Sequence, residues 1–139
     1  MTTVYPLFKK ALADGADVDL ANQTLEGTSA PIKAVLVSST YTYNAAHDFR
    51  DDLTGVIATS SALSSTTWSS SGTGYVFDAA DITFSAVAGG STVDAVVLFF
   101  DTGTPGTSPL ICYDQVTSTA TNGGDITITF NASGIFTVD

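Results

Sequence analysis

The sequence predicts a mostly β protein: an antiparallel β-sandwich, jelly-roll or immunoglobulin-like, with a short N-terminal helix. The 139 residues are enough for one domain, spanning 1–139, and too few for two. Thr, Val, Ile, Phe and Tyr are abundant, whereas the chain has one Glu, one Met and four Lys plus Arg, so surface helix formers are scarce. Eight or nine short apolar stretches alternate with Gly- and Asn-rich turns, as in small β-sandwiches.

The segment 4–14 is the only one with a clear helical pattern. Its apolar residues recur at helical spacing: Val4, Leu7, Phe8, Ala11 and Leu12. Pro6 is tolerated in a first helical turn, and Gly15 can end the helix. The apolar stripe must pack against the domain's own core or against another subunit. We take Val4, Tyr5, Leu7 and Phe8 as candidate interface residues, with packing onto the chain's own core as the alternative.

The strands are predicted from two kinds of pattern. The run Ala95–Phe100 is continuously apolar, as expected of a strand buried on both faces, and Asp125–Phe130 alternates without a break. The segment 44–55 resembles one or two helical turns, and Asn22–Pro31 a polar loop. The other candidate strands are 17–20, 32–37, 56–58, 66–69, 74–77, 82–87, 110–116 and 135–138.

The charge balance excludes several classes of partner. Fourteen acidic and four basic residues give a net charge of −10, which repels phosphate backbones and anionic lipid surfaces, so we expect neither nucleic acid nor membrane as a partner. The single cysteine, Cys112, cannot form an internal disulfide. No signal peptide is visible, and the longest apolar run is six residues, so we expect synthesis in a cytoplasm.

The segment Asp101-Thr102-Gly103 after an apolar strand matches the signature of an aspartic protease. That chemistry needs two such aspartates sharing a proton, which a homodimer would supply. Dimeric enzymes of this kind carry the motif early and an apolar-apolar-Gly segment well downstream, and the 38 residues after Asp101 contain no such segment. A strand that ends in an Asp/Gly turn is therefore the favoured interpretation.

The remaining candidates are weaker still, and a structural role is favoured for each. His47 lies among acids, but there is no nucleophile elbow to make it part of a Ser-His-Asp set. The pairs Asp17/Asp19 and Asp78/Asp81 lack the spacing of a calcium loop. Two more residues have a functional alternative to core packing: Cys112 as a nucleophile and Trp68 as a sugar-stacking ring. We therefore expect no catalytic residues, no cofactor and no metal.

Several segments, taken in order, resemble small virion structural proteins of tailed bacteriophages, including capsid decoration and accessory proteins. Each segment is short, and the match depends on their colinear order along nearly the whole chain; residues 24–30 form an extra loop. The segments are Tyr5–Leu12, Ala16–Leu20, Ile32–Val37, His47–Phe49 with Asp52-Leu53, Val56–Leu63, Asp78–Phe84, Phe100–Thr104, Asn122–Phe130 and Gly134–Phe136.

The resemblance implies a non-enzymatic particle protein that resides in the virion and is made in the cytoplasm of a bacterial host. We expect a capsid decoration or cement protein, bound as a homo-oligomer to the outside of the head shell through the major capsid protein. The alternatives are a tail, fibre or baseplate component bound to tail proteins, a dimeric aspartic protease using Asp101, and a carbohydrate-binding sandwich using Trp68.

Overall fold

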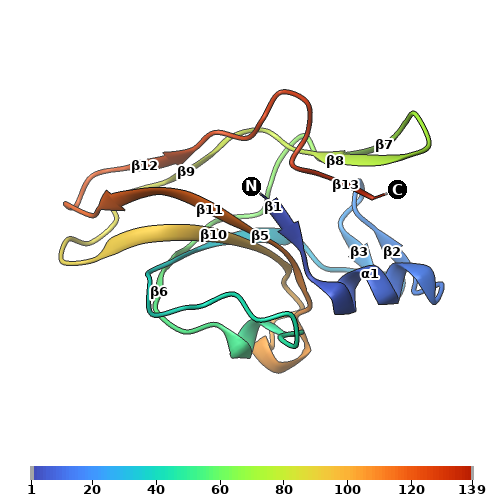
Figure 1. The fold of residues 1–139 in the computed structure, drawn as a ribbon, viewed down its shortest axis with the longest axis horizontal. Helices are drawn as coiled ribbons and strands as arrows, with labels where there is room; N and C mark the ends of the chain where they lie inside the picture. The colour runs from blue at the N-terminus through green and yellow to red at the C-terminus, as the bar shows by residue number, and fades with distance from the viewer. Residues whose placement is uncertain (1, 139) are drawn as a thin grey trace.

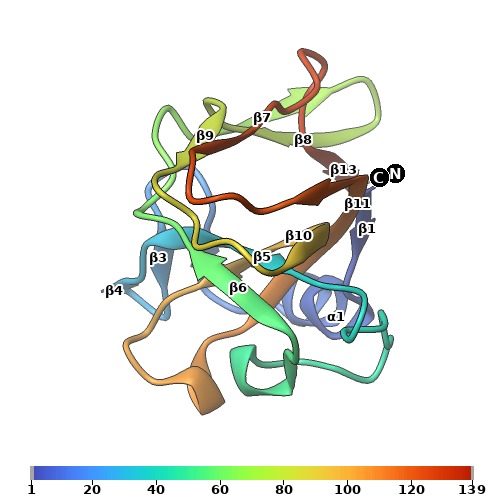
Figure 2. The same ribbon diagram turned by 90° about the vertical axis from the view of Figure 1, so that its left-hand side faces the viewer.

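The computed structural model describes residues 2–138 and is mostly β, with antiparallel sheets in a sandwich-like arrangement and one short helix near the N-terminus. Figure 1 shows one large sheet below two smaller ones, and Figure 2 shows the same layers end-on. This confirms the predicted fold class. The large sheet has the order β1-β11-β10-β5-β6, formed by Thr2–Val4, Leu110–Ala120, Thr92–Phe100, Ile32–Val37 and Val56–Thr59.

The large sheet is buried on both faces along its centre. Every residue from Ala95 to Phe100 is buried, which explains why that run is continuously apolar. Cross-strand partners share a face, so Val35, Val97 and Tyr113 point to one side. The rings of Tyr41 and Tyr43 cover that side, while the other side faces the smaller sheets.

The second layer consists of two small sheets. One pairs β12 with β9, at Ile126–Ile128 and Ile82–Phe84; the other has the order β13-β8-β7, at Phe136–Val138, Gly74–Asp78 and Thr67–Ser71. A third small sheet, β2-β3-β4, lies beside the helix at Val18–Asp19, Thr24–Leu25 and Thr28–Ser29. The expected loop 24–30 is therefore largely a β-hairpin.

The N-terminal helix is shorter than predicted. Helix α1 spans Pro6–Ala13, and Val4 lies instead in strand β1, opposite Cys112. The reason is local: a residue before proline is disfavoured in the helical region, and Tyr5 is extended, with φ −62° and ψ 133°. The proline then starts the helix at a position where its missing N–H is no loss.

The expected helical turns between residues 44 and 55 reduce to one 3-10 turn, η1, at Arg50–Asp52. Asn44 caps only a turn, accepting a hydrogen bond from the Ala46 N–H at 2.9 Å. The segment crosses the outer face of the large sheet and ends near a second 3-10 turn, η2, at Pro105–Thr107. The segment covers the sheet, and its backbone therefore follows the sheet surface instead of forming a regular helix.

Candidate functional site

Three of the four candidate interface residues are used inside the chain. Val4, Tyr5 and Phe8 are buried, at 7%, 0% and 4% exposure, and only Leu7 is open to solvent at 41%. The Phe8 ring packs on Phe100 of the central strand, with centroids 6.3 Å apart. The alternative of packing onto the chain's own core therefore holds for these three residues, because β1 and α1 close one end of the sandwich.

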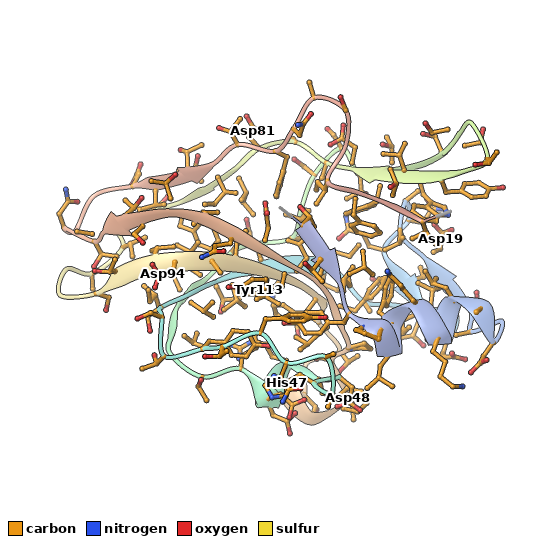
Figure 3. All side chains as sticks on the ribbon, in the orientation of Figure 1. Asp19, His47, Asp48, Asp81, Asp94 and Tyr113 are labelled. Atoms are coloured by element: carbon orange, nitrogen blue, oxygen red, sulfur yellow. The ribbon has the colours of Figure 1, made fainter. Side chains whose placement is uncertain are left out.

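Tyr5 belongs to a buried polar chain that the sequence did not indicate. Its hydroxyl lies 2.7 Å from the Tyr41 hydroxyl, which lies 3.0 Å from Nδ1 of His47. Figure 3 shows Tyr113 beneath the large sheet and His47 lower still, in the covering segment. Burial raises the pKa of Tyr5 and of Tyr41, which favours the neutral form of both hydroxyls. These hydrogen bonds tie the covering segment to the sheet and give Nδ1 of His47 a partner in Tyr41.

Asp101 lies in a turn and forms an ion pair. Its Oδ2 is 2.7 Å from Nζ of Lys33 on the neighbouring strand, and its Oδ1 accepts a hydrogen bond from the Gly103 N–H at 2.9 Å. The Lys33 ammonium, then the Gly103 N–H, lower the pKa of this carboxyl. A protease aspartate must instead share a proton with its twin, which raises one pKa. The geometry therefore favours the turn interpretation.

Three other candidate acids, Asp19, Asp78 and Asp81, also accept hydrogen bonds within the chain. Asp19 accepts from the backbone and side chain of Asn22, Asp78 from the Ala79 N–H and Asp81 from the Phe130 N–H. Figure 3 shows Asp19 and Asp81 on separate parts of the surface. Within residues 2–138, no three His, Cys, Asp or Glu side chains gather where they could hold a metal ion.

Cys112 and Trp68 are both packed. Cys112 is 1% exposed, and burial raises the pKa of its thiol, so the reactive thiolate is disfavoured. The Trp68 ring stacks on Tyr75 with centroids 5.4 Å apart and also contacts Phe136. Tyr75, which is 51% exposed, covers one face of the indole, so that face of Trp68 is not free to stack on a sugar.

Grooves on the surface are the remaining candidate sites. The first, called the helix groove, has a volume of about 360 Å³ and runs between α1, the β2–β3 hairpin and the loop before β11. Its apolar lining includes Leu7, Ala11, Val18, Phe49 and Pro109. Leu7 is thus the one candidate interface residue that the structure places on an accessible apolar surface.

The second, called the strand groove, has a volume of about 430 Å³ and separates β11 from β12. It is lined by Val93, Asp114, Val116, Thr117, Thr119 and Asp125–Thr129. A wider groove of about 870 Å³ between β1 and residues 129–137 adjoins it, since Asp114 and Thr129 line both. The sequence predicted both strands, but no local signal shows that they separate.

Comparison with protein-family models, with curated proteins and with solved structures found no match for this chain. Among residues 2–138, no helix has the length and apolar character needed to cross a membrane.

Proposed function

We propose that this protein is a non-enzymatic structural component of a bacteriophage particle, a decoration or cement protein on the outer surface of the head shell. One observation carries the proposal: the side chains best suited to catalysis have structural roles. His47 is hydrogen-bonded to Tyr41, Asp101 forms an ion pair with Lys33, and Cys112 is buried. What the molecule offers to solvent is grooves and strand edges, which are binding features. The colinear resemblance to virion proteins supports the view that this binding takes place in a phage particle.

The charge supports an external position. A chain with a net charge of −10 is repelled by the packaged DNA inside a head. A shell protein must also grip a repeated lattice, and an apolar surface is suited to that. The helix groove around Leu7 is the surface that we assign to this contact, because it joins an exposed leucine to an apolar lining.

The test is addition of the purified protein to particles produced without its gene, followed by reconstruction and copy counting. The proposal expects hundreds of copies over the head surface, whereas a few dozen copies on the tail would support a tail, fibre or baseplate component. Leu7→Asp should reduce binding at least tenfold and leave the fold intact. Ser71→Asp, at an exposed position on β7, is the matched control and should bind normally. No binding to any part of the particle would reject the proposal.

A further inference from the structure

The strand groove is bordered by two strands that each have an open side. Strand β11 pairs with β10 on one side, but β1 pairs with it on the other side only from Cys112 to Asp114. Beyond that, β11 continues to Ala120, leaving six residues, about 20 Å at ~3.3 Å per residue, with no second partner strand among residues 2–138. Across the groove, β12 pairs with β9 alone.

The separation of β11 from β12 is fixed by the turn that joins them. The Gly123 N–H donates to the Val87 carbonyl at 2.8 Å, and the Val87 N–H donates to the Gly124 carbonyl at 2.9 Å. Asp125 also accepts a hydrogen bond from the Ala86 N–H at 2.9 Å. The turn is therefore bound to the segment after β9, which draws β12 toward β9 and holds the groove open.

The open edge follows the path of an existing strand. β1 runs antiparallel to β11 with Thr2 opposite Asp114, so a strand continuing that line would lie opposite Gln115 and the residues after it. The lining suits such a strand, because Val116 and Ile126 are half-buried apolar side chains, the buried Val93 and Ile128 complete the apolar floor, and threonines line the edges. An extended segment with apolar side chains at every second position fits that pattern.

The charge of the groove selects among possible strands. Asp114 and Asp125 line it, in a chain of net charge −10. A second copy offers no basic extended segment, because Lys33 is in the central sheet, Lys9 and Lys10 are on α1, and Arg50 is in η1. Charge complementarity therefore favours a strand from a different protein with lysine or arginine between its apolar residues.

We propose that the strand groove accepts an extended, basic segment of a partner protein, which pairs with β11 in line with β1. The inference rests on the proposed function, in which that partner is another virion protein. The strand groove would then be a second site, besides the helix groove, at which this chain attaches to the particle. Main-chain hydrogen bonds to the β11 edge supply affinity, and the apolar lining fixes the register of the partner strand.

The test uses the whole chain and a blocked octapeptide that alternates valine with lysine and threonine. Amide exchange in the free protein should be fast at the outward-facing amides of 115–120 and slow at 112–114, where β11 has partner strands on both sides. Adding the peptide should slow exchange at least tenfold at 115–120 and shift the NMR signals of Asp125–Thr129. A peptide with glutamate in place of lysine should bind at least tenfold more weakly.

Thr119→Trp fills the groove and should abolish peptide binding, whereas Thr67→Trp, on exposed β7, should not. Circular dichroism and the melting temperature check that both variants fold. Equal binding of the two peptides, shifts elsewhere on the surface, or no protection at millimolar peptide would overturn the inference. So would concentration-dependent protection of 115–120 without peptide, because it would identify a second copy as the occupant. None of these outcomes depends on whether the protein binds to particles, so the two proposals fail separately.

Discussion

Replacing Asp101 with asparagine tests whether this residue is a structural or a catalytic acid. Asparagine keeps an oxygen that can accept the Gly103 N–H, so the turn survives, but the ion pair with Lys33 is lost. If Asp101 were a protease aspartate, the variant would lose all proteolysis. In our interpretation there is no activity to lose, and the change appears only in stability.

The size of the effect follows from exposure. The Lys33 and Asp101 side chains are 28% and 25% exposed, so the pair lies between a surface ion pair, worth about 0.2–1 kcal/mol, and a buried pair, whose disruption costs about 3–5 kcal/mol. We expect Asp101→Asn to lower the free energy of unfolding by about 1.5 kcal/mol at pH 7. With a urea m-value of about 1–3 kcal/mol/M, the unfolding midpoint falls by roughly 1 M.

The pH dependence gives the sign of the effect. The folded state lowers the pKa of Asp101, mainly through Lys33, below the value of about 3.9 in an unfolded chain. The contribution to stability is therefore complete above pH ~4 and is lost as the pH falls through the lower, folded pKa. Urea unfolding at pH 7 and at pH 2 should show a difference between wild type and Asp101→Asn that is larger at pH 7 than at pH 2.

A matched control is the exposed ion pair between Lys10 on α1 and Asp14 at the C-cap of that helix, whose side chains are 67% and 59% exposed. Asp14→Asn should cost no more than about 0.5 kcal/mol, as for other exposed helix pairs. The reasoning is refuted if Asp101→Asn is no more costly than Asp14→Asn, or if its cost is the same at both pH values. If the wild type digests casein and Asp101→Asn does not, the result would support the aspartic protease interpretation instead.

Two further predictions concern backbone shape and the buried hydroxyls. Gly134 has φ +109°, and a Cβ there would collide with the Val76 side chain and lie 3.2 Å from the Phe77 carbonyl oxygen. Gly134→Ala should therefore lower the thermal midpoint by several degrees. Gly72→Ala, at φ +63° with open space around the added Cβ, should lower the midpoint far less, and equal shifts for the two variants would contradict the steric argument. Tyr5→Phe should cost about 1 kcal/mol at pH 7 in urea unfolding. Because burial raises the pKa of Tyr5, the wild type loses stability as the pH rises above ~10 and the gap to Tyr5→Phe should narrow there; a constant gap would count against it.

The strands were predictable because their signals are local. The continuous run at Ala95–Phe100 and the alternation from Asp125 both form strands, with the second ending at Ile128. The candidate site was less predictable, because its contacts join distant parts of the chain. Tyr5 and Tyr41 are 36 residues apart, and nothing near either residue indicates that their hydroxyls meet. The apolar stripe at residues 4–12 predicts a buried face, but it does not show whether the chain's own core or another subunit covers that face.

The strand groove shows how a local signal can suggest the wrong partner. Two strands joined by a short Asn-Gly-Gly turn ordinarily pair as a hairpin, which would place β12 against β11. Here the hydrogen bonds of Gly123 and Gly124 go to Val87, so the same turn joins β12 to β9. A sheet edge left open in this way is a liability for a soluble protein unless something covers it. The long open edge of β11 lies beside an apolar lining and acidic borders, and this combination supports our proposal that an extended segment of a partner protein binds there.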